Sequence, residues 1–258
     1  MRFARFKLDT DTPYMGWIHE DSIGGIEGDL FSDYRRLEAE TPLSSVKLLA
    51  PVNPSKIICV SRNFPDHVKE QGNDIPEIPV LFLKPPSAII GTNEDIIIPP
   101  QSTQIEHEAE LAVVIKKMGR WIPSEEAMEF VLGFTIANDV TARDLQYREE
   151  QWTRAKGFDT FCPLGPWIET DFEPSDSLIT CHVNGDLRQM GSTREMIFTV
   201  PQLIAYASSI MTLLPGDILL TGTPAGVGPL TPGDVIEISI EGIGTLRNQV
   251  KASQSFLK

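Results

Sequence analysis

The sequence has few cysteines, and their number and spacing exclude small domains that are held together by disulfides or by zinc. The 258-residue chain contains three of them: Cys59, Cys162 and Cys181. An odd number of widely separated cysteines forms no disulfide framework, and no pair has the close spacing of zinc ligands. We therefore expect a reduced protein held together by an apolar core, since 41% of its residues are hydrophobic.

Basic residues are also scarce. The chain has 22 Lys and Arg against 36 Asp and Glu, which gives a formal net charge of −14 at pH 7. Nucleic acids and anionic membrane surfaces attract basic patches, so neither is an expected partner. Anionic small molecules are not excluded, because a single site can be positive on an acidic protein.

Long apolar runs are missing as well. No segment approaches the roughly 20 apolar residues that cross a bilayer, and the N-terminal stretch Met1–Lys7 lacks the apolar centre of a secretory signal. These absences predict a cytoplasmic protein. Its length fits one large domain, or one domain with a small appendage.

The most informative stretch is residues 105–115, Ile-Glu-His-Glu-Ala-Glu-Leu-Ala-Val-Val-Ile. Its second half is apolar without polar alternation, which is typical of a strand buried on both faces. On a strand, alternate residues share a face, so Glu106, Glu108 and Glu110 are expected to point the same way. Their mutual repulsion requires something in front of them: a divalent cation, an Arg/Lys cluster, or water against an edge strand.

His67 and Glu70 form a second candidate site. Pro65 and Asp66 are helix-start signals, and residues three apart lie on one face of a helix. A carboxylate beside an imidazole orients it and raises its basicity, which suits a general base that acts through water. An incidental pair on a surface helix explains the same spacing.

A third group of polar residues follows the apolar run 133–137. Asp139 can ligate a hard cation through oxygen, Arg143 can clamp a carboxylate, and Gln146 can form a hydrogen bond with a carbonyl. Taken singly, each is better explained as a solvated loop residue.

The rest of the chain predicts mainly strands and turns. Residues 1–50 are interpreted as short strands with turns at 10–13 and at Gly24-Gly25, followed by helical potential at 34–40. The proline-containing segment 51–54 marks a boundary, which gives a small N-terminal domain at 1–52 and a main domain at 53–258. Helices are expected within 119–134 and at 201–213, where Leu203, Ile204, Ala207 and Ile210 share a face. Residues 179–186 and 235–250 predict strands joined by tight turns.

Together these residues resemble the fumarylacetoacetate hydrolase family over residues 51–252. The first fifty residues look like the small, variable N-terminal domain of many bacterial members. The resemblance rests on motifs in a fixed order: Arg62-Asn63-Phe64 with His67 and Glu70, then residues 82–87, 108–115, 138–146 and 151–159, then Pro215-Gly216-Asp217 with Thr221-Gly222-Thr223-Pro224.

The resemblance implies a mainly β fold with few helices (α+β), a mixed β-sheet roll preceded by a small N-terminal domain, and a homodimer. It implies Mg²⁺ or Mn²⁺ held by Glu108, Glu110 and Asp139, three carboxylates that suit a hard octahedral cation. It leaves Glu106 without a role. For catalysis it implies His67, Glu70 and Lys156, and for substrate binding Arg62, Asn63, Arg143, Gln146 and Thr223.

Two positions depart from the family pattern. Ser61 and Phe64 stand where many members have Gly and Tyr. Loss of the phenol hydroxyl at position 64 predicts one substrate hydrogen bond fewer than in the Tyr-bearing members.

The family's substrates are 2-oxo acids, often with a second carbonyl two carbons away. Through a metal-bound enolate, one site can support hydrolysis to pyruvate and an acid, decarboxylation as for oxaloacetate, or isomerisation of 2-hydroxyhepta-2,4-diene-1,7-dioate or 5-carboxymethyl-2-hydroxymuconate. The presence of His67, Glu70 and Thr223 favours C–C bond hydrolysis of an acylpyruvate-like β-diketo acid. Two alternatives from other classes are a catalytically silent 2-oxo acid binder and a metal-free acidic interaction module.

Overall fold

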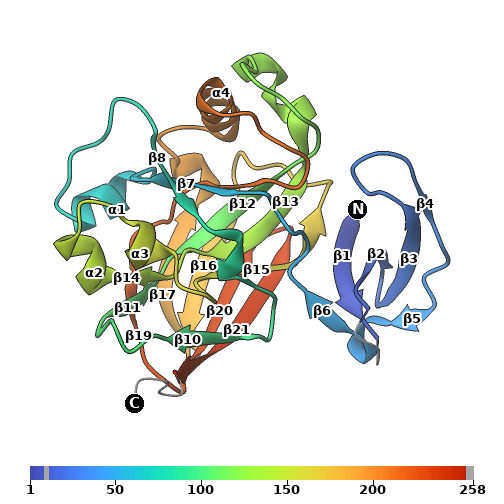
Figure 1. Ribbon diagram of the computed structural model, residues 1–258, viewed down its shortest axis with the longest axis horizontal. Coiled ribbons are helices and arrows are strands. Elements are labelled where there is room, and N and C mark those ends of the chain that lie inside the picture. Colours follow the sequence, from blue (N-terminus) through green and yellow to red (C-terminus); the bar gives the residue numbers. More distant parts are fainter. Residues whose placement is uncertain (9–11, 254–258) are drawn as a thin grey trace.

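The computed structural model describes residues 1–8 and 12–253, and this part of the chain is mainly β, as predicted (Figure 1). Its largest sheet is built from β1 (Arg2–Lys7), β2 (Tyr14–His19), β3 (Ser22–Gly28), β4 (Tyr34–Arg36), β5 (Thr41–Pro42), β6 (Lys47–Leu49), β7 (Ile57–Ser61), β8 (Val80–Lys84), β9 (Ile89–Ile90), β12 (Ala109–Ile115), β13 (Val131–Asn138), β15 (Cys162–Glu169) and β18 (Ile218–Leu220). The strand order is β4-β3-β2-β1-β15-β13-β12-β18-β7-β8, with β5 on β3, β6 on β1 and β9 on β15. This sheet mixes parallel and antiparallel pairs, because β18 runs parallel to β7 and antiparallel to β12.

A second sheet packs against the first. It has the order β10-β21-β20-β16-β17, from β10 (Asp95–Ile98), β21 (Gly244–Ala252), β20 (Val235–Ile240), β16 (Leu178–Val183) and β17 (Asp186–Ser192). The hairpins β16-β17 and β20-β21 confirm the strands and tight turns predicted near residues 184 and 242. Between the two sheets lies the main apolar core, so the predicted β-sheet roll is confirmed.

Strand β12 runs through the middle of this architecture, and all its residues are buried. Leu111, Val113 and Ile115 face the core shared with the second sheet. Ala112 and Val114 face the opposite core, with Ile57 and Leu164 among its members. Both faces of the strand are therefore apolar, which is why its sequence shows no polar alternation.

A small sheet and the helices frame one side of the roll. The small sheet has the order β14-β11-β19, from β14 (Thr141–Ala142), β11 (Ile105–His107) and β19 (Gly228–Leu230). Close to it lie α1 (Pro65–Glu70), α2 (Arg143–Arg148) and α3 (Thr153–Lys156), at the left in Figure 1. The remaining helices are α4 (Val200–Ile210) and the short 3₁₀ helices η1 (Leu43–Ser45), η2 (Pro86–Ala88), η3 (Ser124–Phe130) and η4 (Thr193–Glu195).

The N-terminal strands β1–β6 lie together on the other side, at the right in Figure 1. Within the large sheet they are connected to the remaining strands through β1, whose Arg2 and Phe3 pair with Glu169 and Ile168 of β15. The division into domains 1–52 and 53–258 stays a prediction. The predicted turn at 10–13 includes Thr10 and Asp11, which lie outside the described residues.

Two N-terminal predictions are wrong. Gly24-Gly25 is not a turn but lies inside β3, paired with β2. A side chain at Gly24 would meet the carbonyl oxygen of Glu38 at 2.5 Å, so this glycine permits close approach of two chain segments. The expected helical segment at 34–40 instead begins with strand β4, because residues 34–36 find hydrogen-bonding partners on β3.

The two predicted helices are shorter than expected. In the 119–134 region only Ser124–Phe130 is helical, as 3₁₀ turns, because Val131 already pairs with Ile115 on β12. In α4 the predicted face of Leu203, Ile204 and Ala207 is buried. Ile210, at the end of this face and of the helix, is 51% exposed.

The helices and the cysteines can be compared with what the composition predicted. None of the helices in the described chain has the length and apolar character needed to span a lipid bilayer. Cys59, Cys162 and Cys181 are free and buried. Burial raises the pKa of both Cys162 and Cys181 to about 12, so these thiols stay protonated at neutral pH.

Asp217, next to β18, provides a test of the fold. Its buried carboxylate accepts hydrogen bonds from Ser55 Oγ at 2.6 Å and from the backbone nitrogens of Lys56 at 3.2 Å and Leu214 at 2.8 Å. Asp217→Ala leaves these donors without an acceptor, so we expect urea unfolding to show a free energy of unfolding lower by about 3 kcal/mol. The exposed Asp186→Ala is the control and should change little. Equal losses in the two variants would contradict the role given to Asp217.

Candidate active site

The acidic stretch spans a change of sheet. Ile105–His107 pairs with β14 and β19, whereas Ala109–Ile115 pairs with β13 and β18. Glu108 lies between the two strands, held by a hydrogen bond from its N–H to Asn138 Oδ1 at 3.0 Å. Asp139, just after β13, donates its N–H to the Glu108 carbonyl at 2.9 Å. The strand ends thus bring Asp139 beside Glu108.

Glu108, Glu110 and Asp139 form a buried carboxylate triad. One oxygen from each lies within 4.8 Å of the others, and none of the three residues is more than 5% exposed. The alternative of an edge strand with a wet acidic face is therefore wrong. Glu106 is also buried but belongs to a different set of contacts.

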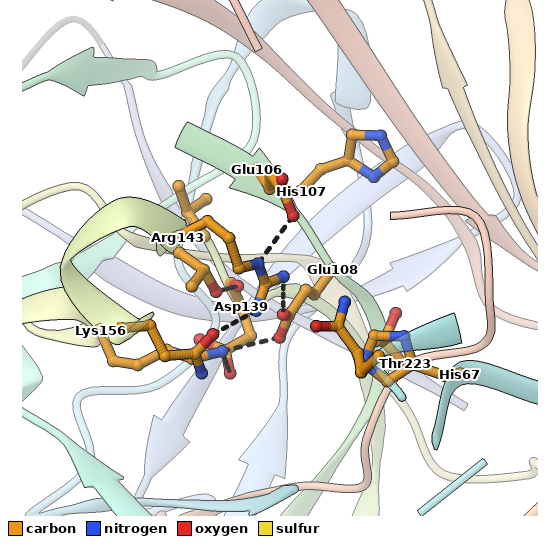
Figure 2. Close-up of polar contacts among 12 residues, drawn as sticks. His67, Glu106, His107, Glu108, Asp139, Arg143, Lys156 and Thr223 are labelled. Carbon is orange, nitrogen blue, oxygen red and sulfur yellow. Dashed lines mark hydrogen bonds and ion pairs between the residues drawn. The ribbon is translucent and has the colours of Figure 1, made fainter. Parts of the chain in front are cut away.

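An Arg/Lys cluster faces these acids, as one of the predicted alternatives required (Figure 2). Arg143, the first residue of α2, contacts both Glu106 and Glu108. The ammonium of Lys156, at the end of α3, lies 2.7 Å from Glu108 Oε2 and 2.7 Å from Asp139 Oδ2. Glu106, which the sequence left without a role, thus holds Arg143: its Oε2 accepts a hydrogen bond from Arg143 Nε at 2.7 Å.

Lys84 is a member of this cluster that sequence reasoning did not assign. Its Nζ donates to Asp139 Oδ1 at 2.6 Å and to the Val140 carbonyl at 3.2 Å, and its side chain is fully buried. The signal was present in the sequence: a lysine ends the apolar run 80–83 and precedes two prolines. A charged side chain that is carried into the interior by an apolar strand requires a partner.

The charges around the triad do not balance. Four carboxylates, from Glu106, Glu108, Glu110 and Asp139, stand against the three cations Lys84, Arg143 and Lys156. Burial, followed by the charges of Asp139 and Glu108, raises the pKa of Glu110 well above its ordinary value. Burial acts in the same direction on Glu108, but Lys156 and Arg143 outweigh it and hold the pKa of Glu108 far below its ordinary value.

The donor set fits a hard divalent cation. Three carboxylates offer oxygen ligands of the kind that Mg²⁺ and Mn²⁺ prefer. A cation there would also offset the surplus negative charge, which adds to the effect of burial in raising the pKa of Glu110. The four carboxylates, the three side-chain cations, one divalent cation and one substrate carboxylate would together carry no net charge.

The predicted His67–Glu70 pair is formed on α1. Pro65 begins this helix, as predicted, and His67 Nδ1 lies 3.1 Å from Glu70 Oε2. Glu70 Oε1 also accepts a hydrogen bond from the Gly226 N–H at 3.0 Å. Since Nδ1 is taken by Glu70, Nε2 of His67 is the ring nitrogen left for a ligand. The alternative of an incidental surface pair is not favoured, because His67 is 8% exposed.

One pocket brings most of the predicted residues together. It is lined by the triad, His67, Arg143, Lys156, Arg62, Gln146 and Thr223, with Ser61, Phe82, Tyr147 and Trp152 among the remaining lining residues. Glu70 reaches this pocket through His67. Gln146 lies beside Arg143, whose Nη1 donates to its Oε1.

Asn63 and Phe64 lie outside this pocket lining. Asn63 is buried and donates to the Thr221 carbonyl at 2.7 Å and to the Phe198 carbonyl at 3.1 Å. Its side chain therefore supports the chain near Thr221 instead of facing the pocket. Phe64 is 1% exposed and packs in the main core, so the structure gives no support to a direct effect of its missing hydroxyl on substrate binding.

Comparison with known proteins places the chain in a family. A family model described as fumarylacetoacetate (FAA) hydrolase C-terminal matches residues 56–251, and a model described as Rv2993c-like, N-terminal matches residues 1–51. The chain therefore belongs to the fumarylacetoacetate hydrolase family, which confirms the resemblance of its motifs.

Its relatives carry names of different reactions. The oxaloacetate tautomerase Fahd2a, mitochondrial, of Rattus norvegicus is 46% identical over 231 residues, which cover 84% of this chain and 74% of the relative. The crystal structure of 5-carboxymethyl-2-hydroxymuconate delta-isomerase from Mycobacterium smegmatis is 45% identical with a TM-score of 0.92, over 98% of this chain and 100% of that chain. A maleylpyruvate hydrolase from Sphingobium sp. SYK-6, in complex with manganese(II) and pyruvate, is 33% identical with a TM-score of 0.83, over the same shares.

The surplus charge gives a stability prediction with a definite sign. In metal-free protein the raised pKa of Glu110 makes stability fall as the pH rises from 4.5, where the unfolded carboxyl ionises, towards the folded pKa. Glu110→Gln keeps the shape and removes this cost. We therefore expect the variant in EDTA at pH 8 to have a free energy of unfolding higher by about 1 kcal/mol or more.

Glu106→Gln is the matched control, because this carboxylate is also buried but is paired with Arg143. It should lower the free energy of unfolding, since the buried guanidinium loses one of its two charged partners. Denaturant titrations between pH 5 and pH 8 measure both variants. A loss of stability in both would contradict the account of the charge surplus.

Proposed function

We propose that this protein is a Mg²⁺- or Mn²⁺-dependent enzyme that moves a proton at the carbon next to the carbonyl of a 2-oxo acid. The observation that carries the proposal is the presence of the His67–Glu70 pair and the buried carboxylate triad in one pocket. Glu108, Glu110 and Asp139 would hold the cation, which when bound supplies Lewis-acid polarisation of substrate oxygens.

His67 is the proposed general base. Glu70 fixes the ring through Nδ1, as a carboxylate does beside a catalytic imidazole. Nε2 is then free to take the proton from the substrate carbon, or from a water molecule.

Lys156 is the proposed electrostatic partner of the developing enolate oxygen. Asp139 and Glu108 outweigh the effect of burial and raise the pKa of Lys156. Its amine therefore stays protonated at neutral pH, which excludes it as a base and suits it to stabilise negative charge. Arg143, Gln146 and Arg62 are the proposed contacts for the substrate's remaining oxygens, and Asn63 supports the site without lining it.

Tautomerisation or isomerisation of the 2-oxo acid is the reaction we place first. It needs only a base, a charge-stabilising group and a bound substrate. The relatives whose names state this chemistry include two that are 45% and 46% identical to the chain. C–C bond hydrolysis, which the sequence favoured, is the second candidate, because the same base can activate water and structures named as hydrolases share the fold at 33–40% identity. Decarboxylation of oxaloacetate is the third candidate, because loss of CO₂ leaves an enolate that the same groups would stabilise.

The remaining parts of the proposal concern cellular location, oligomeric state and partners. We propose a cytoplasmic homodimer with a small-molecule substrate and neither nucleic acid nor membrane as a partner. Light scattering coupled to size-exclusion chromatography would detect a dimer as twice the 28.6 kDa chain mass.

Two readouts test the proposed function. Exchange of the pyruvate methyl protons for deuterium in D₂O, followed by proton NMR, reports enolisation whatever the later step. A panel of oxaloacetate, acylpyruvates, maleylpyruvate and a 2-hydroxy-dienedioate then separates tautomer, acid and CO₂ as products. Metal-dependent exchange is expected. Stoichiometric binding with no exchange and no product would favour a silent binder, and no Mg²⁺-dependent rise in melting temperature would favour a metal-free module.

Removal of one carboxylate should abolish the activity. Glu110→Ala takes one of three ligands, so we expect at least a 100-fold loss of turnover, on the order of 3 kcal/mol in the barrier, even with excess Mg²⁺. The melting temperature of the variant should no longer rise with Mg²⁺ or Mn²⁺. Near-normal turnover would eliminate the metal role of the triad.

His67→Gln should separate the candidate reactions. The variant keeps a polar side chain but cannot accept a proton, so deuterium exchange and hydrolysis should both fall by about 100-fold or more. Metal-assisted decarboxylation of oxaloacetate needs no base and should fall less. Equal losses in all three assays would count against the assignment of His67 as the base.

A further inference from the structure

Gln189, on β17, is a buried side chain with a fixed orientation. Its Oε1 accepts the N–H of Ala109 at 3.0 Å, and its Nε2 donates to the Pro224 carbonyl at 2.8 Å. A backbone N–H can only donate and a carbonyl can only accept, so the two ends of the amide cannot be exchanged. The residue is 0% exposed, so water offers it no alternative partner.

The fixed amide determines the role of the Thr223 hydroxyl. The second hydrogen on Gln189 Nε2 points to Thr223 Oγ at 2.7 Å, so this oxygen accepts. The hydroxyl must then direct its own hydrogen elsewhere, and no other described residue forms a hydrogen bond with it. Thr223 lines the pocket together with Glu108 and Lys156, so that hydrogen is available to a ligand.

His107 secures the other end of the same amide. Its Nδ1 lies 2.8 Å from Gln189 Oε1, which accepts, so Nδ1 carries a hydrogen. The ring is 1% exposed, and its Nε2 has no hydrogen-bond partner within the described part of the chain. Figure 2 shows the His107 ring lying apart from Lys156 and Asp139, although Glu108 is its neighbour in sequence. His107 therefore contacts Gln189 and not the carboxylate triad.

We propose that Gln189, held by His107, is a positioning residue that makes Thr223 a hydrogen-bond donor to the substrate. The pocket then selects a ligand with an acceptor oxygen at Thr223, a carboxylate, carbonyl or enolate oxygen. Neither Gln189 nor His107 carries a role in the sequence motifs described above. The identity of the ligand as a 2-oxo acid rests on the proposed function, whereas the direction of the hydrogen bonds does not.

The direction of the hydrogen bonds can be tested without substrate or metal. Long-range proton–nitrogen NMR of the ligand-free protein should show a hydrogen on His107 Nδ1, and a Gln189 side-chain amide whose hydrogens exchange slowly with solvent. In Thr223→Val one of those amide hydrogens should lose protection. A His107 ring protonated at Nε2 alone would overturn the proposal.

The effect on ligand binding is tested with pyruvate in the presence of Mg²⁺, by calorimetry. Gln189→Glu supplies only acceptors and would attract the Thr223 hydrogen away from the pocket. Gln189→Glu and Thr223→Val should each weaken pyruvate binding by about tenfold, the loss of one hydrogen bond to a charged acceptor. Thr223→Ser, which keeps the hydroxyl, should bind nearly as the wild type does.

The double variant decides whether Gln189 acts through Thr223. Gln189→Glu should add no further loss in the Thr223→Val background, because the hydroxyl is already gone. A multiplicative loss there would show that Gln189 acts on packing, and would overturn the proposal. If Gln189→Glu does not fold, the resonance data on wild type and Thr223→Val still decide it. If wild-type protein with the expected Nδ1 hydrogen fails to bind pyruvate, the proposed function fails, and the hydrogen-bond direction stands.

Discussion

The energetic centre of the structure is the attraction between buried carboxylates and the few cations that reach them. Charges removed from water are stable only when they are paired, and here the pairing is incomplete by one negative charge. Arg143 and Lys156 lie at the ends of short helices because those helices must bring cations to Glu108 and Asp139. The same imbalance makes the site attractive to a divalent cation, so one feature both restrains the fold and prepares the chemistry.

The rest of the roll supplies the rigidity that this pairing needs. The chain leaves the small sheet at His107 and enters the large sheet at Ala109. The two acids that follow His107 are therefore anchored by apolar residues on β12, which are packed between two cores. Side chains at the junction of two sheets are held in position by the backbone of both sheets, more precisely than side chains on a surface loop.

Local patterns predicted what local forces decide. The apolar run of β12, the helix start at Pro65 and the C-terminal hairpins follow from residues close together in sequence, and all are present in the structure. The interior position of Gly24 and the strand at residues 34–36 depend on partners elsewhere in the chain, so no local pattern could show them. In the site, residue type and motif order indicated the triad and the His–Glu pair. The buried ion pair of Lys84 and the amide of Gln189 depend on contacts 55 and 80 residues away in sequence.

The hydrogen bond between Glu70 and Gly226 connects α1, which carries the proposed base His67, to the chain segment that carries Thr223. Glu70 uses one carboxylate both to orient His67 and to hold this segment. Separation of α1 from this segment would keep the imidazole beside its orienting carboxylate, because both lie on α1, but it would widen the pocket between His67 and Thr223. The carboxylate that orients the ring thus also sets how far the imidazole lies from the opposite wall of the pocket.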